Sequence, residues 1–285
     1  GSNGPVCQGS ILNLYASTTT SYPALKWSWK GPNSFSSNQQ NSALLNMMPI
    51  NTGSYIVTAS IYGCRSSDTE TISMNTLPAK PVINSNTPVC SDGTLNLSAS
   101  TTTTGVLYSW TGPNSFTSAT QNPSISNISS AAAGDYVATA TIIATGCIAK
   151  DTEAVVVRLT PTAYATNNTP VCEDDTVKLF STATPAGSFS WSGPNSFSSA
   201  GQDAVIMNAS PAASGDYIVS VTFNGCTGKD TTTVFVKLAP IMPLTGRNTP
   251  VCAGATLNLT ANSNAGATYS WTGPNGFLST QQNPV

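Results

Sequence analysis

Apolar side chains alternate with polar ones over many short stretches of this chain. Leu12 and Leu14 flank a polar residue, as do Leu95 and Leu97, Val177 and Leu179, and Leu257 and Leu259. A period of two with one apolar face predicts half-buried β-strands. No stretch keeps a 3.6-residue period, and Gly and Pro interrupt the pattern repeatedly. The pattern therefore predicts an all-β protein of short strands.

This pattern recurs four times. Asn-Thr-Pro-Val-Cys ends at Cys90, Cys172 and Cys252, and a looser Gly-Pro-Val-Cys ends at Cys7, so the copies are 83, 82 and 80 residues apart. A copy of that length is a small domain, not one turn of a solenoid. We predict four domains, called repeats 1 to 4: residues 1–78 (first strand missing), 79–161, 162–240 and 241–285 (truncated).

Aromatic residues mark the expected core of each repeat. A central strand carries two aromatic rings spaced by two residues, and a later strand begins with Gly-x-Tyr. The core residues that we predict are Trp29, Trp110, Trp191, Trp271, Tyr55, Tyr136 and Tyr217. Short strands with a central Trp and a Tyr entering a late strand predict an immunoglobulin-like β-sandwich. The fold class is thus tandem Ig-like β-sandwiches, and the proline-bearing joints suggest an extended rod.

Seven cysteines follow the repeats. Cys7 and Cys64, Cys90 and Cys147, and Cys172 and Cys226 occupy matching places at separations of 57, 57 and 54 residues. The partner of Cys252 would lie beyond Val285. We expect disulfides within each repeat, at one end of the sandwich, each stabilising the fold by roughly 4 kcal/mol. An oxidising, extracytoplasmic location follows.

Composition narrows the function. Only 22 of 285 residues are charged, the net charge is -2, and there is no histidine. This excludes the basic face that nucleic acid requires, and no long apolar or amphipathic segment indicates membrane insertion. Without histidine there is no Ser-His-Asp or Cys-His nucleophile, and no pair of carboxylates recurs. We predict a protein that is not an enzyme and has no cofactor.

A metal site is also not expected. There is no Cys-x-x-Cys and no histidine to complete a tetrahedral shell. The acidic run Glu173-Asp174-Asp175 lacks the spaced oxygen ligands of a calcium loop.

Other residues have a functional and a structural interpretation. The strand aromatics form either a platform for sugar rings or the core, and we favour the core. We expect Phe35, Phe116, Phe197 and Phe277 to plug the sheet, and Gln40, Gln121, Gln202 and Gln282 to satisfy backbone groups. For Asp68, Asp151 and Asp230 we expect a loop-capping role.

The motif set resembles a known class of repeats. Thr-Pro-Val-Cys, a Leu-x-Leu strand, Tyr-Ser-Trp-Thr-Gly-Pro-Asn, Gly-Asp-Tyr and Gly-Cys are similar to the Ig-like or PKD-like repeats of large Bacteroidetes cell-surface adhesins. These include gliding-motility adhesins exported by the type IX secretion system. The resemblance implies a β-sandwich stalk on an outer-membrane-attached or released filament, at the cell surface or outside the cell. It supplies no catalytic residues.

Two functions follow as hypotheses. The first is a structural spacer in a long secreted adhesin or filament that supports surface adhesion or gliding, with neighbouring repeats of the same chain as its partners. The second is a multivalent array whose units each bind a glycan or surface polymer weakly and gain avidity from number.

Overall fold

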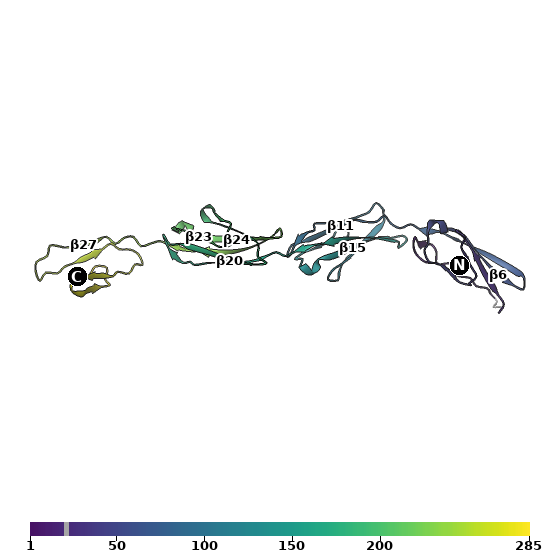
Figure 1. Ribbon diagram of the computed structural model, residues 1–285, viewed down its shortest axis with the longest axis horizontal. Coiled ribbons are helices and arrows are strands. Elements are labelled where there is room, and N and C mark those ends of the chain that lie inside the picture. Colours follow the sequence, from purple (N-terminus) through teal and green to yellow (C-terminus); the bar gives the residue numbers. More distant parts are fainter. Residues whose placement is uncertain (20–22) are drawn as a thin grey trace. The chain divides into compact units, whose positions relative to one another are not determined.

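The computed structural model describes residues 1–19 and 23–285 (Figure 1). The regular structure of the described residues consists of β-strands and short 3-10 helices, in two compact units, Gly1–Leu159 and Thr160–Val285. The predicted fold class, tandem Ig-like β-sandwiches, is confirmed. The boundaries at residues 78, 161 and 240 stay predictions.

Repeat 2 is a two-sheet sandwich. Its elements are β9 (Val82–Ser85), β10 (Val89–Cys90), β11 (Leu95–Ser100), β12 (Val106–Gly112), β13 (Phe116–Ser118), β14 (Ser124–Ile125), η2 (Ser130–Ala132), β15 (Gly134–Ile142), β16 (Ile148–Val155) and β17 (Val157–Arg158). One antiparallel sheet has the order β14-β11-β9 and the other β13-β12-β15-β16, while β10 pairs with β17 in parallel. This is the strand arrangement of an Ig-like domain.

Repeat 3 has the same topology. Its elements are β18 (Thr162–Asn167), β19 (Val171–Cys172), β20 (Val177–Thr184), β21 (Ser188–Gly193), η3 (Pro194–Ser196), β22 (Phe197–Ser199), β23 (Ala204–Ile206), η4 (Pro211–Ala213), β24 (Gly215–Phe223), β25 (Cys226–Val234) and β26 (Val236–Lys237). The sheets are β18-β20-β23 and β22-β21-β24-β25, with β19 parallel to β26.

Repeats 1 and 4 are variants of this plan. Repeat 1 contains β1 (Val6–Cys7), β2 (Leu12–Leu14), β3 (Lys26–Lys30), β4 (Ser36–Ser37), β5 (Ser42–Leu44), η1 (Pro49–Asn51), β6 (Gly53–Ile61), β7 (Cys64–Ile72) and β8 (Met74–Asn75). Its four-stranded sheet is β4-β3-β6-β7, and β1 is parallel to β8. Repeat 4 contains β27 (Thr245–Arg247), β28 (Leu259–Ala261), β29 (Trp271–Gly273), η5 (Pro274–Gly276) and β30 (Phe277–Ser279), in two hairpin-like pairs.

The alternating side chains build the cores. On β11, Leu95 and Leu97 are buried against Trp110 and Tyr136 from the opposite sheet. The same positions are buried in repeats 1 and 3, where Trp29, Trp191, Tyr55 and Tyr217 are each at most 2 % exposed. Trp271 of repeat 4 is half-buried. Burial of these rings contributes most of the apolar area of each small core.

Each core tyrosine is also fixed by a hydrogen bond. The Tyr217 hydroxyl donates to the carbonyl of Ala213 at 3.0 Å, and Tyr136 and Tyr55 donate to the residue four positions earlier at 3.0 and 2.9 Å. This is the tyrosine corner of Ig-like domains. Burial raises the pKa of all three phenols above its ordinary value, so the hydroxyls stay protonated donors.

The Gly-Pro-Asn turn makes room for that tyrosine. A Cβ atom on Gly193 would lie 2.4 Å from Cδ1 of Tyr217, which no real side chain permits. Phe197 then packs edge-on against the same ring, with centroids 5.3 Å apart. The glycine, the phenylalanine and the tyrosine therefore form one packing unit, and it recurs at Gly112, Phe116 and Tyr136.

The tyrosine corner gives a first prediction. Tyr217→Phe removes the bond to the Ala213 carbonyl, which stays buried, so repeat 3 should lose about 1–2 kcal/mol of unfolding free energy. Hydrogen-exchange mass spectrometry of β24 in increasing urea measures the loss. Tyr164→Phe is the matched control, because that ring is 60 % exposed. Equal protection in the two variants would show that the corner does not stabilise the repeat.

Candidate functional site: the disulfide between repeats 1 and 2

The first cysteine of repeats 1, 2 and 3 lies where the chain leaves the sandwich. Cys7 in β1 is in register with Asn75 in β8, three residues before Pro78 of the joint. The equivalent pairs are Cys90 with Arg158 and Cys172 with Lys237. These short pairings place each Pro-Val-Cys segment beside the last strand of its own repeat, and because they are parallel the two segments run in the same direction.

The second cysteine lies at the opposite end of the same sandwich. Cys64 and Cys226 open β7 and β25, and Cys147 immediately precedes β16. Each stands eleven residues before the partner residue of the first cysteine. At about 3.3 Å per strand residue the two cysteines are roughly 36 Å apart, whereas a disulfide requires Cα atoms within about 7 Å.

The expected pairing within repeats is therefore wrong. Cys7 is bonded to Cys147, with Cα atoms 5.6 Å apart and a sequence separation of 140. Cys64 and Cys172 are exposed free thiols, as is Cys252, so Cys64 does not pair with Cys7 and Cys172 does not pair with Cys226. Cys90 and Cys226 are disulfide-bonded as well.

The bond joins two consecutive repeats. It connects the exit end of repeat 1 to the β15–β16 hairpin at the entry end of repeat 2, and the Cys147 side chain is 1 % exposed. Closing a loop of this length disfavours the unfolded chain by about 5 kcal/mol in the chain-entropy model. The same bond restricts the joint between the repeats, which a disulfide within one sandwich would not do.

Polar contacts fasten the joint to repeat 2. Ala79 donates its N–H to Thr103 Oγ1 at 2.8 Å and accepts from Thr101 Oγ1 at 2.8 Å. Lys80 Nζ lies 2.7 Å from Asp151 Oδ1 in β16. The linker is therefore anchored by hydrogen bonds and one ion pair next to the disulfide-bearing hairpin.

Asp68, Asp151 and Asp230 lie inside β7, β16 and β25, so the expected loop-capping role is wrong. They accept backbone N–H groups instead: Asp68 from Thr69, Asp151 from Thr152, and Asp230 from Ala165. The Lys80 ammonium, and then the Thr152 N–H, hold the pKa of Asp151 below its ordinary value. Both partners are partly exposed, so the ion pair positions the linker more than it stabilises the fold.

A second prediction concerns this carboxyl. Lys80→Ala should raise the pKa of Asp151 towards its ordinary value, with part of the lowering kept because Thr152 still donates. The depressed pKa means that the contribution to stability is present at neutral pH and disappears as the pH falls through the folded-state value. A ¹³C NMR titration of the carboxyl measures the shift. Lys150→Ala is the control, and an equal shift in that variant would refute the pairing.

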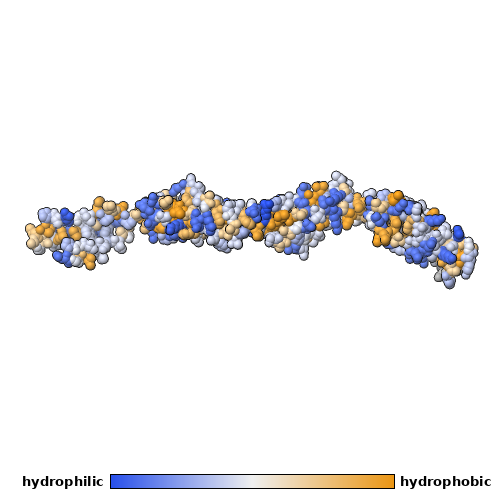
Figure 2. Space-filling model, in the orientation of Figure 1, coloured by the Kyte–Doolittle hydropathy of each residue, from blue (hydrophilic) through white to orange (hydrophobic). Residues whose placement is uncertain are grey.

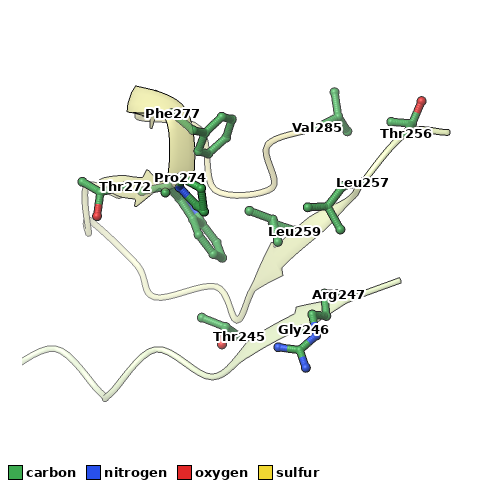
Figure 3. A pocket seen from close by; sticks show the side chains of 12 residues that line it. Thr245, Gly246, Arg247, Thr256, Leu257, Leu259, Thr272, Pro274, Phe277 and Val285 are labelled. Atoms are coloured by element: carbon green, nitrogen blue, oxygen red, sulfur yellow. The ribbon is translucent and has the colours of Figure 1, made fainter. Parts of the chain in front are cut away.

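A cavity of about 710 Å³ in repeat 4 lies between Leu257 and Leu259 on one side and Pro274 and Phe277 on the other (Figure 3). In repeat 3 the equivalent Leu179, Trp191 and Phe197 pack around Tyr217. The described part of repeat 4 has no counterpart of that tyrosine. We therefore interpret the cavity as the volume that a core tyrosine and its strand fill in repeat 3, and not as a ligand site.

A smaller cavity in repeat 1 has a different character. It measures about 220 Å³, and its lining includes Trp27, Tyr15 and Asp68. Trp29, Trp110 and Trp191 are buried and offer no face to a sugar. Trp27 is half-buried and lines this cavity, so the platform interpretation stays a hypothesis for this residue alone among the four tryptophans of repeats 1 to 3.

The glutamines have the structural role expected of them. Gln121 Nε2 donates to the backbone carbonyl of Ala99 at 2.7 Å, and the backbone carbonyl of Gln121 accepts from Trp110 Nε1 at 3.2 Å. Gln40 and Gln202 make the same two bonds, and Gln282 makes the first of them. These bridges join the two sheets and fix the indole.

The acidic run of repeat 3 binds backbone groups. Asp175 accepts from the Cys172 N–H and Glu173 from the Ala239 N–H. Within residues 1–19 and 23–285, no group of three or more His, Cys, Asp or Glu side chains is placed to hold a metal ion. In the same described ranges, no helix is long and apolar enough to cross a membrane.

No protein-family model and no curated protein matches the chain. Among solved structures, the Ig1–Ig3 ectodomain of mouse nectin-like molecule 4 is 13% identical, covering 82% of this chain and 96% of that one, with a TM-score of 0.36. The titin I-band fragment I67–I69 is 15% identical over 82% and 94%, with a TM-score of 0.38. Three N-terminal domains of the bacteriophage RB49 outer capsid protein Hoc are 14% identical over 82% and 96%, with a TM-score of 0.35.

The disulfide gives a third prediction. In a non-reducing proteolytic digest, the peptide containing Cys7 should be linked to the peptide containing Cys147. Alkylation without reduction should label Cys64, Cys172 and Cys252, which are exposed free thiols. Mass spectrometry identifies both sets. A peptide linking Cys7 to Cys64 would contradict the structure.

Proposed function

We propose that the chain is a structural spacer segment of a long, repetitive, secreted cell-surface adhesin or filament that supports surface adhesion or gliding. The observation that carries this is the Cys7–Cys147 bond, because it joins consecutive repeats through a cysteine, Cys147, whose side chain is buried. A second covalent bond between consecutive domains restricts the joint between them, which suits a protein that acts as a spacer. The motif resemblance to Bacteroidetes gliding-motility adhesins of type IX secretion supports the same function.

The location proposed is extracellular, at the cell surface. Disulfides persist in oxidising compartments and are rare in the cytosol, and four cysteines of this chain are disulfide-bonded. A surface poor in charge and rich in Ser, Thr and Asn suits that setting. Attachment to an outer membrane or release as a filament belongs to the proposal through the resemblance alone.

The exterior also supports a spacer. Hydrophobic and hydrophilic residues are interspersed over the face shown in Figure 2. Partner-binding patches are usually contiguous apolar areas with a polar rim. The proposed partners are therefore neighbouring repeats of the same chain.

A second candidate is the multivalent array of weak glycan- or polymer-binding modules. The cavity at Trp27 favours it, because an indole face beside Tyr15 and Asp68 combines stacking with polar contacts for a sugar. Binding by many weak sites gains affinity from number.

A glycan array probed with the whole chain separates the two functions and is the fourth prediction. The spacer predicts no saturable binding to sugars or to surface polysaccharides. Binding that Trp27→Ala abolishes, and that the exposed-site control Tyr62→Ala retains, would establish the array instead.

A further inference from the structure

We infer that the Cys7–Cys147 disulfide is a covalent bypass that carries tension past most of repeats 1 and 2. That the bypass carries tension in the cell rests on the proposed spacer function. The path itself follows from connectivity alone, so it holds whatever load the cell applies.

Connectivity offers tension two routes between Cys7 and Cys147. One is the peptide chain, in which the separation of 140 leaves 139 residues between the two cysteines. The other is the single sulfur–sulfur bond. A pull on Gly1 reaches Cys7 after six residues and passes through the shorter route, so β2 through β15 are not stretched.

Beyond Cys147 the load enters a strand that is already extended. Residues 148–158 form β16 and β17, which run from the entry end of repeat 2 to its exit end. A strand rises about 3.3 Å per residue, close to the 3.3–3.6 Å limit of a fully stretched chain. This segment therefore lengthens little under tension and acts as a tie between the disulfide and the next joint.

The pairing of β16 keeps that tie in place. All eight of its residues are paired with β15, from Thr141↔Ile148 to Gly134↔Val155. Tension along β16 is resisted at both ends by covalent bonds, so it does not pass through these hydrogen bonds. The rest of the repeat 2 sandwich is attached to this segment by strand pairing and does not itself carry the tension.

Pulling on specific residues tests the bypass and is the fifth prediction. Handles are attached to unnatural amino acids at Gly1 and Leu159 of the whole chain, and extension is recorded in optical tweezers. The distance between the two handles in the oxidised protein should not exceed roughly 70 Å, the limit for residues 1–7 and 147–159 with the disulfide between them. The Cys7→Ser/Cys147→Ser variant should release roughly 480 Å more, because 139 residues join the path.

Two controls keep the test decisive. Cys64→Ser removes an exposed free thiol inside the same loop and should extend like the parent. If the double variant does not fold, a phosphine reductant added to a single oxidised molecule under tension gives the same comparison, with a long release expected only after the addition.

The outcomes separate this inference from the spacer. Equal released lengths in the parent and the double variant, or before and after reduction, would overturn the bypass. The spacer function would not be affected by that result, because the glycan array tests it separately. A short parent and a long variant establish the bypass even where the array shows binding.

Discussion

The structure of repeats 1 to 3 depends on the parallel pairing of each Pro-Val-Cys segment with the final strand of its repeat. In repeat 1 this pairing holds Cys7 beside Asn75, at the end where the chain leaves. The final strand then takes the second cysteine to the far end of the same sandwich. Two thiols separated by the length of a domain cannot meet, so neither cysteine can form a disulfide within its own sandwich, and Cys7 is bonded to Cys147 of repeat 2.

The sandwich itself relies on one packing unit. A buried tyrosine fills the space that a glycine leaves open, and a phenylalanine packs edge-on against the tyrosine ring. The tyrosine hydroxyl donates to the backbone carbonyl four residues earlier. A glutamine bridge then fixes the tryptophan on the opposite side of the core. Repeats of about 80 residues bury limited apolar surface, which explains why each one reuses the same specific contacts.

Much of this was predictable from the alternation of side chains. The strand that holds Leu95 and Leu97 follows from the alternation of apolar and polar residues with a period of two. The hydrogen bonding of Gln121 to the backbone follows from its place as a polar residue beside the indole of the core. The disulfide pairing did not follow, because spacings of 57, 57 and 54 residues are the same whether partners lie in one repeat or in two. The usable signal was the length of the last strand, which sets its ends too far apart for one bond.

The aspartates show a similar limit. The sequence predicts a turn at Asp151, beside Thr152, but Asp151 lies within β16 and forms an ion pair with Lys80 of the preceding linker. Local propensity describes the residue and its neighbours in sequence. A contact between segments about seventy residues apart depends on where the linker runs, which only the tertiary structure reveals.

The closed ring between Cys7 and Cys147 has a kinetic consequence. If repeat 1 opens while repeat 2 stays folded, its strands remain tethered at both ends and search a much smaller volume than a free chain. Part of the loop-closure entropy that slows the assembly of non-local β-pairs is then already removed. Repeat 1 should therefore refold quickly after it has unfolded, which leaves its unpaired strand edges little time to associate with other molecules.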